Sequence, residues 1–326
     1  LAYSYIFSAH LFISHQGITY LCYLIQTASA NCTRLTAENL KRRKPMLSVR
    51  QSASKYFLLI LLCLFYSPEF LNAQETDLPL VPSPSVFDFT RGEGWGFALG
   101  AGLEYESAYD GSDEYEVEVE PAGAIQWRTG NHLFFWEGIE LGWRGKLSDR
   151  SLLQFGMRYE SGREEDDSDD GRLDGLEDQD NEIVAVLEGR WSLDTEWRNW
   201  IAGRIMAGDS DFGILGVLAA GHRFGSHFDG TGTEIYLFTT FGNSDFLNRD
   251  FGVTASESLA SGLEETDLSG GYRSVGGTLI DRRYLTKNIH FICKAGIEYY
   301  SSDIRDSPIA RQDYEAEAGV SVVYHF

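Results

Sequence analysis

The residues Tyr314–Phe326 read Tyr-Glu-Ala-Glu-Ala-Gly-Val-Ser-Val-Val-Tyr-His-Phe, and they decide the fold class. In an extended strand, alternate side chains point to opposite faces. An apolar face with aromatic ends, opposite a small or charged face, is typical of a transmembrane β-barrel strand. An amphipathic edge strand of a soluble β-protein alternates in the same way. One face carries Tyr314, Ala316, Ala318, Val320, Val322, Tyr324 and Phe326, and the other carries Glu315, Glu317, Gly319, Ser321 and His325.

The chain upstream repeats this period of two. In Glu114–Arg128, glutamates at every second position oppose valine, isoleucine and tryptophan. Such acids need water on their side of the sheet, so they exclude a dry soluble core there. Eleven strand candidates emerge, although membrane barrels of one chain prefer even numbers. They are 94–105, 114–128, 132–144, 152–160, 183–193, 198–207, 214–224, 233–242, 272–284, 289–299 and 314–326.

The N-terminal 73 residues contain the three parts of a secretory signal. Met46 opens a sequence with positive residues Arg50 and Lys55, the apolar run Tyr56–Tyr66, and a small residue, Ala73, for cleavage. We therefore predict that residues 1–45 are translated upstream sequence, that 46–73 are a cleavable signal peptide, and that 74–93 form a proline-containing periplasmic lead-in. Residues 94–326 are then the barrel. An alternative reads Leu11–Ala28 as a membrane helix, which polar residues interrupt.

Composition narrows the possible fold classes, since no long apolar helix pattern dominates. Glycine (34 residues) and aromatic residues (13%) are abundant, whereas proline (7) and methionine (3) are scarce. Removing residues 1–73 takes away seven basic and two acidic residues, which leaves a net charge of about −27. Nucleic-acid phosphates would be repelled by such a charge, so we expect no nucleic-acid partner. One cysteine, Cys293, remains in the predicted mature chain, which excludes a disulfide framework.

A β-sandwich also shows short alternating strands, and single strands do not exclude it. The signal pattern, the aromatic strand ends and the final Phe326 together favour an antiparallel transmembrane β-barrel of about 12 strands (10 to 12). A terminal phenylalanine resembles the terminal signature of bacterial outer-membrane barrels. We expect the protein in the outer membrane of a Gram-negative bacterium, in contact with outer-membrane lipid.

Loop lengths predict which connections lie outside. Outer loops of such barrels are long and inner turns are short. Counting strands back from Phe326 makes 285–288 and 194–197 inner turns and places 306–311, 244–271 and 161–181 outside. Counting forward from a periplasmic N-terminus places 161–181 inside instead. We follow the backward count, because it makes the longest connections extracellular.

The acidic stretch Asp166–Glu177 fits the twelve-residue calcium loop of an EF-hand. A hard cation needs six to eight oxygen ligands, and a glycine at position 6, here Gly171, makes the sharp turn. The candidate calcium ligands are Asp166, Ser168, Asp170, Arg172 (through its carbonyl), Asp174 and Glu177. However, strands rather than helices flank this loop, and a solvated loop of mutually repelling charges is the alternative. No other cofactor is expected.

Four stretches show that the chain resembles the MipA/OmpV family of outer-membrane proteins (MltA-interacting protein). They span most of the predicted mature chain in the order of the family. Two local departures are Asn288–Ile289, where an aromatic residue is expected, and Arg249–Asp250, where Ser-Tyr is usual. The stretches are Tyr109–Tyr115; Gly162–Ser168 through Gly175–Asp178; Phe251–Val253 with Ser261–Leu263; and Asp306–Ile309 before Tyr324–Phe326.

The resemblance implies a scaffold that holds a lytic murein transglycosylase and a bifunctional penicillin-binding murein synthase at the outer membrane. Other members are associated with adhesion or with osmotic and antibiotic responses. A small-solute channel or a surface binding barrel therefore remains an alternative, which inward-facing acids such as Glu116 and Glu118 suggest. A lipid hydrolase would need serine, histidine and an acid in one array. The mature histidines show no such motif, so we expect no enzyme: His132, His222, His227, His290 and His325.

Overall fold

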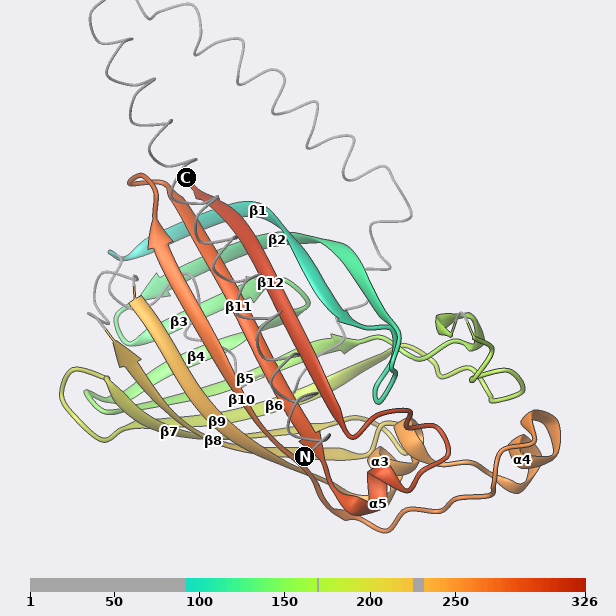
Figure 1. Cartoon of the computed structure of the whole chain (residues 1–326). Coiled ribbons are helices and arrows are strands. Elements are labelled where there is room, and N and C mark those ends of the chain that lie inside the picture. The colour runs from blue at the N-terminus through green and yellow to red at the C-terminus, as the bar shows by residue number, and fades with distance from the viewer. Residues whose placement is uncertain (1–91, 169, 225–231) are drawn as a thin grey trace, which may run out of the picture. The chain divides into compact units, whose positions relative to one another are not determined.

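The computed structural model describes residues 92–168, 170–224 and 232–326 (Figure 1). The predicted upstream segment, the signal peptide and most of the lead-in, as well as His227, lie outside these residues. Those assignments stay predictions.

Twelve antiparallel strands close into one barrel, in which each strand pairs with its neighbours in sequence and β1 pairs with β12. The predicted β-barrel of 10 to 12 strands is confirmed. The strands are β1 (Gly94–Ser107), β2 (Tyr115–Thr129), β3 (His132–Glu137), β4 (Glu140–Ser148), β5 (Ser151–Glu160), β6 (Glu182–Ser192), β7 (Asn199–Ala207), β8 (Ile214–Phe224), β9 (Gly232–Gly242), β10 (Gly271–Tyr284), β11 (Ile289–Tyr300) and β12 (Tyr314–His325).

The strand missing from the eleven sequence candidates lies within 132–144. This stretch is the hairpin of β3 and β4, whose strands are joined only by Gly138 and Ile139. Gly138 adopts a φ of +54°, which glycine takes without strain and which a two-residue hairpin of this kind requires. The interpretation of 132–144 as one strand was wrong, because a two-residue turn leaves no stretch of polar residues in the sequence to mark the break between the strands.

The last strand, β12, closes the barrel against β1. Ala98 of β1 pairs with His325 of β12, and the backbone N–H of Phe326 donates to the carbonyl of Phe97 at 3.0 Å. On its other side, β12 pairs with β11, where Val322 lies opposite Phe291.

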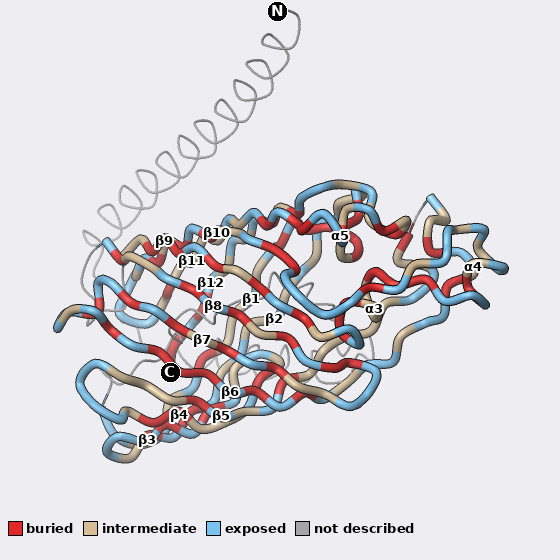
Figure 2. The backbone as a smooth tube through the Cα atoms, turned by 90° about the horizontal axis from the view of Figure 1, so that it is seen from below, coloured by how far each residue is buried: buried red, intermediate tan, exposed pale blue. Residues whose placement is uncertain are grey.

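Outward-facing side chains form an apolar belt around the barrel. Buried and exposed positions alternate along the strands (Figure 2), as expected for a lumen-facing set and a lipid-facing set. Aromatic residues mark both ends of the belt. Tryptophan concentrates at one end, in Trp95, Trp127, Trp143 and Trp191, and tyrosine at the other, in Tyr105, Tyr115, Tyr159, Tyr272, Tyr299 and Tyr314.

The two ends of the barrel differ in their connections. The end that carries Gly94 and Phe326, called here the terminus end, has the described turns 130–131, 149–150, 193–198 and 285–288. The opposite loop end has the connections 108–114, 161–181, 243–270 and 301–313, besides the short turns 138–139 and 208–213. With the twelfth strand, both directions of counting place 161–181 at the end away from the termini.

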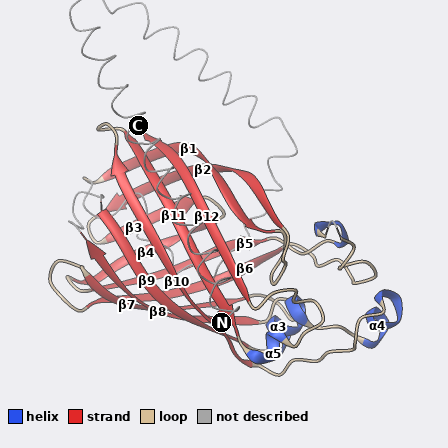
Figure 3. Cartoon of the chain, viewed as in Figure 1, coloured by secondary structure: helices blue, strands red, loops and turns tan. Residues whose placement is uncertain are grey.

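All helices of the described residues lie at the loop end (Figure 3). They are the 3-10 turn η2 (Glu165–Asp167), α3 (Ser244–Phe251), α4 (Ala255–Ser261) and α5 (Ser302–Arg305). Side chains cap the N-termini of α3 and α4. Asn243 accepts a hydrogen bond from the N–H of Phe246, and Thr254 accepts one from the N–H of Glu257. In the described residues, no helix is long and apolar enough to cross a membrane.

Several glycines let aromatic rings lie flat on the barrel wall. A Cβ atom on outward-facing Gly189 would lie 2.5 Å from the ring of Trp191, and one on inward-facing Gly221 would lie 2.3 Å from the ring of Trp200. Any larger residue at either position would have to displace the indole.

Candidate functional site

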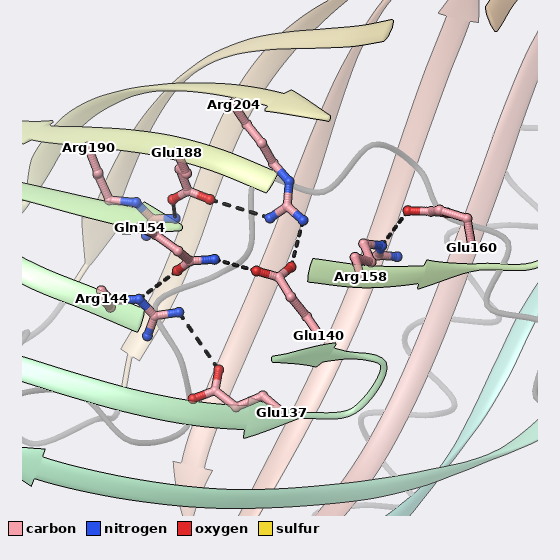
Figure 4. A network of polar contacts seen from close by, with 9 residues as sticks. All are labelled: Glu137, Glu140, Arg144, Gln154, Arg158, Glu160, Glu188, Arg190 and Arg204. Atoms are coloured by element: carbon pink, nitrogen blue, oxygen red, sulfur yellow. Dashed lines mark hydrogen bonds and ion pairs between the residues drawn. The ribbon is translucent and has the colours of Figure 1, made fainter. Parts of the chain in front are cut away.

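A network of ion pairs lines one side of the barrel lumen, on β3 to β7 (Figure 4). Arg204 of β7 contacts Glu140 of β4 at 2.6 Å and Glu188 of β6 at 3.4 Å. Because β4 and β7 are not neighbours in the sheet, the pair of Arg204 and Glu140 joins separate parts of the wall. Buried charges are stable only when paired and hydrogen-bonded, and this network supplies both.

Gln154 of β5 extends the network toward the terminus end. Its amide nitrogen donates to Glu140, and its oxygen accepts from Nε of Arg144 at 2.7 Å. Arg144 in turn lies 3.8 Å from Glu137. Two pairs of residues on single strands complete the view in Figure 4: Arg190 with Glu188 at 2.9 Å and Arg158 with Glu160 at 2.6 Å.

Two further lumen clusters lie on the strands from β8 to β1. Glu234 of β9 accepts from Arg223 of β8 and lies 3.6 Å from Arg282 of β10. Lys294 of β11 contacts both Glu104 of β1 and Glu317 of β12, the latter at 2.9 Å. The lysine therefore bridges strands on both sides of the closing seam.

Arg273 ties a loop to the lumen. The register of β10 against β9 shifts between Tyr272 and Ser274, so Arg273 turns inward at this irregularity. Its guanidinium pairs with Glu298 of β11 at 2.6 Å and with Asp110 of the connection 108–114. It also lies 5.2 Å from the ring of Tyr300, within the range of a cation–π contact.

Lumen charges segregate along the barrel axis. Inward-facing arginines concentrate near the terminus end: Arg128, Arg190, Arg223 and Arg282. Inward-facing carboxylates concentrate near the loop end: Glu104, Glu106, Glu116, Glu118, Glu298, Glu315 and Glu317. Glu116 and Glu118 are exposed or half-buried, whereas the others are buried.

Apolar side chains from the loops close part of the loop end. Phe246, Leu247 and Phe251 of α3 belong to the same buried cluster as Phe238 of β9 and Tyr300 of β11. Phe251 meets Tyr300 edge-on at 5.5 Å between ring centroids. The loop residues thus pack into the mouth of the barrel rather than over bulk water.

A second apolar cluster, the loop core, holds the connections to one another. It consists of Ala108, Tyr109, Leu173, Leu176, Val253 and Ile309, with Leu263 packed against it. Hydrogen bonds support it: Arg163 donates to the carbonyl of Asp250 at 2.7 Å, and Ser307 donates to that of Phe251 at 2.6 Å. The four long connections therefore form one folded unit.

One carboxyl group in this unit has a shifted pKa. Burial raises the pKa of Asp250 to about 6, and the carboxylate of Asp110 adds to the rise. The arginines 249, 273 and 163 oppose the shift but do not cancel it.

The predicted calcium loop folds as part of the loop unit. Gly171 has a φ of +72°, as the sharp turn of the motif requires. Asp170 Oδ1 accepts from Oγ of Ser168 at 2.8 Å and from the N–H of Arg172 at 2.9 Å, and Oδ2 lies 3.4 Å from Arg311.

The remaining predicted ligands are only partly brought together. The carboxylate of Asp174 lies beside Gly171, and the backbone of Glu177 donates to Glu257 at 3.1 Å. Asp166 lies in η2, and its side chain is not described. Among described residues, no group of three or more His, Cys, Asp or Glu side chains is arranged to hold a metal. Calcium binding stays a prediction.

The terminus end presents an ordered turn between β6 and β7. Partial burial opposes ionisation of Asp194, but the N–H groups of Arg198, Asn199 and Glu196 outweigh it and lower its pKa to about 2. Trp197 takes a φ of +56° and donates from Nε1 to the carbonyl of Asp149 at 2.8 Å. The turn is therefore held by its own side chains.

The described histidines contact aromatic or amide groups. His132 accepts from Trp143 at 3.3 Å, and His222 bonds to Asn199 at 2.7 Å. His290 stacks on Tyr284 with ring centroids 4.4 Å apart, and His325 lies 5.7 Å from His290.

Sequence reasoning missed the lumen pairs and the loop core. Alternation identified which residues face inward, but contacts between separated strands depend on the closed geometry. The spacing of leucines 173 and 176 inside an acid-rich loop was the available signal for the loop core.

Among curated proteins, none matches the sequence. Solved structures that match include the KdgM porin (TM-score 0.34, 11% identity, 70% of this chain and 99% of that chain). The toluene transporter TodX of Pseudomonas putida also matches, with a TM-score of 0.36 and 7% identity over 72% of this chain and 90% of that chain. The COG4313 outer membrane channel of P. putida F1 matches with a TM-score of 0.32 and 10% identity over 73% of this chain and 98% of that chain. Similarity at this level assigns no function.

A sequence family covers most of the described chain. The family described as MltA-interacting protein MipA matches residues 99–326, from the first strand to the last residue. This range begins within β1 and includes β2 to β12 and all loop-end connections. The chain belongs to the MipA family.

Proposed function

We propose that this protein is a non-enzymatic barrel of the Gram-negative outer membrane that recruits a lytic murein transglycosylase and a bifunctional penicillin-binding murein synthase. The family match over residues 99–326 carries the proposal, since its description names an interaction with MltA. The apolar belt with its aromatic borders supports contact with outer-membrane lipid.

The terminus end is the proposed contact surface for the murein enzymes. In the proposed orientation the long connections face outward, so the terminus end faces the periplasm. Its described turns are short, and side chains hold the turn 193–198 through the pairing of Arg198 with Glu196 and the hydrogen bonds to Asp194. Rigid turns lose little conformational entropy when a partner binds.

The structure gives two reasons to favour a scaffold over an open channel. Ion pairs such as that of Arg204 and Glu140 fill part of the lumen along β4 to β7, and α3 packs into the mouth at the loop end. A channel is the second candidate. The lumen of this barrel is lined by ionisable side chains, which a conducting pore would use to select solutes.

A retention assay tests the scaffold. Detergent-solubilised barrel, immobilised, is expected to retain a purified lytic murein transglycosylase and a purified bifunctional synthase. The charge reversals Arg198→Glu and Lys287→Glu at the terminus end should weaken retention at least about tenfold, which corresponds to about 1.4 kcal/mol. Arg311→Glu at the loop end is the matched control and should retain both enzymes.

The same preparations distinguish the scaffold from the channel. Wild-type barrel that retains neither enzyme, but gives stepwise conductance in a planar bilayer, would contradict the scaffold and support the channel. Retention that Arg311→Glu abolishes and the terminus-end variants leave intact would contradict the proposed contact surface.

A further inference from the structure

The wall of the barrel has a gap at the loop end, above the hairpin of β3 and β4. The last pair between β2 and β3 is Ala124 with Glu137, so Tyr115–Gly123 of β2 extends past β3 (Figure 4). At a rise of about 3.3 Å per residue, this overhang runs for roughly 25 Å along the strand. The next longest overhang at this end is Tyr314–Glu317 of β12 beyond its last pair with β1.

The backbone direction in this overhang can be assigned. The carbonyl of Gly123 accepts from the N–H of Gly138, so Gly123 directs its backbone groups toward β3. Backbone direction alternates in an antiparallel pair, and the register of β2 with β1 runs without a shift. Val119, Val117 and Tyr115 therefore direct their N–H and C=O groups into the gap.

Pro121 fits this assignment. It belongs to the same backbone set, and proline lacks the N–H that a ladder would need. Within sheets, proline is confined to such edge positions. The described part of the chain shows no ladder on this side of β2 between Tyr115 and Val119.

The edge lies within the apolar belt, where it needs a partner. The side chains of Val117 and Val119 point outward and are 65% and 68% exposed. Backbone polar groups that face lipid without hydrogen bonds are costly, and a strand added to the edge satisfies them. A lipid hydrocarbon chain has no donors or acceptors and leaves these backbone groups without hydrogen bonds.

Charge determines what kind of strand fits. Glu116 and Glu118 alternate with the two valines and point to the lumen side, where they remain accessible. Glu118 lies in the electrostatic field of Glu116, Glu104 and Asp167, all of them acids. A complementary strand presents basic side chains inward and apolar side chains outward, at the same period of two.

We propose that the edge of β2 at Tyr115–Val119 binds an extended cationic amphipathic peptide segment, with alternating basic and apolar residues, by strand addition. The segment occupies the gap above the β3–β4 turn. Its backbone pairs with β2, its basic side chains face Glu116 and Glu118, and its apolar side chains continue the outer belt.

A peptide-binding measurement tests the proposal on the folded full-length barrel in detergent. The probe is a labelled eight-residue peptide of alternating lysine and valine, and binding is followed by fluorescence anisotropy. Two control peptides are its scrambled isomer and a version N-methylated at alternate residues along one edge, which removes the ladder donors. We expect both controls to bind at least about tenfold more weakly.

Variants of the edge provide the matched test. Val117→Pro removes an N–H that points into the gap and leaves the ladder with β1 intact, so it should weaken peptide binding about tenfold. Glu116→Gln with Glu118→Gln should weaken binding to a similar extent and reduce its salt dependence. Asp303→Asn with Asp306→Asn, which removes two exposed charges from another loop-end connection, should have no effect.

Three results would overturn the proposal. They are equal binding of the scrambled and N-methylated peptides, full binding by Val117→Pro, and equal competition by a long-chain alkylamine. The first two indicate electrostatic attraction without strand pairing, and the third indicates a site for cationic amphiphiles. The N-methylated peptide tests wild-type protein, so the proposal stays testable even if a variant fails to fold.

Discussion

The guanidinium of Arg204 on β7 contacts the carboxylate of Glu140 on β4 at 2.6 Å, three strands away around the barrel. Glu188 is the second acid on the same arginine. The side chain of Arg204 is 1% exposed and that of Glu140 is 8% exposed. Loss of the arginine would leave two acids in the lumen without their shared cation.

Replacing Arg204 by methionine should therefore destabilise the barrel by about 3–5 kcal/mol, because removing one partner of a buried ion pair leaves uncompensated charge. The midpoint of urea unfolding in detergent measures this loss. Arg311→Met, which breaks partly exposed pairs with Asp113 and Asp170, is the control and should cost less than about 1 kcal/mol. Equal losses of stability in both variants would show that the buried pair of Arg204 and Glu140 contributes no more than the exposed pairs of Arg311.

Gly221 and Trp200 provide a second test of lumen packing. A Cβ at Gly221 would lie 2.3 Å from the indole, so Gly221→Ala should cost about 1–3 kcal/mol of unfolding free energy. In a Trp200→Ala background the same change should cost little, because the clash is gone. Gly123→Ala, which meets no atom within 4 Å, is the matched control. An equal cost of Gly221→Ala in both backgrounds would contradict the packing.

The loop core can be tested separately from the barrel. Leu173 is 0% exposed, so Leu173→Ala should cost about 2–4 kcal/mol of local stability. Trypsin should then cut after the neighbouring Arg172 in folded protein, while the barrel keeps its compact mobility on an unheated gel. Leu259→Ala, at a residue that is 90% exposed, should leave the loops resistant. Unchanged resistance of Leu173→Ala would show that this cluster does not hold the loops.

Asp250 predicts a pH dependence of stability. Its pKa is about 6 in the folded protein and about 3.9 in an unfolded chain, so the folded state binds a proton more tightly. This group therefore lowers stability as pH rises from about 4 to 6, and the loss is complete above that range. Asp250→Asn should raise the midpoint of thermal unfolding at pH 7.5 by roughly 2–6 °C and leave it unchanged at pH 4.

Asp250→Ala is the companion variant for this titration. It also lacks the carboxyl group and should lose the same pH dependence. A gain of equal size at pH 4 and pH 7.5 in either variant would mean that packing, rather than ionisation, explains the effect.

Alternation predicted the barrel and its inward charges, but not the partners of those charges. Glu315 and Glu317 face the lumen as the sequence indicates, because period two needs only local geometry. The contact of Arg204 with Glu140 joins residues 64 positions apart and depends on how the sheet closes. Arg273 illustrates a local failure, since the shifted register of β10 turns inward a side chain that strict alternation would place outward.

The acidic loop shows a different limit. Its spacing matches a calcium loop, and Gly171 does make the predicted turn. However, Ser168 and the backbone of Arg172 already bond to Asp170, and leucines 173 and 176 anchor the loop. The spacing of a motif identifies the oxygens that could bind a cation. It does not predict the hydrogen bonds and apolar contacts that fix the loop in another arrangement.

The unequal aromatic borders of the belt make this barrel an optical probe of a single bilayer interface. Trp95, Trp127, Trp143 and Trp191 lie in the half near the termini, and Trp197 and Trp200 lie on the turn and strand that follow β6 at the same end. Emission from the four outward-facing indoles of Trp95, Trp127, Trp143 and Trp191 therefore reports the polarity of one leaflet, whereas Trp136 faces outward nearer the β3–β4 turn and Trp197 and Trp200 are buried. Brominated lipids confined to that leaflet would quench it, and the same lipids in the opposite leaflet would leave most of it intact.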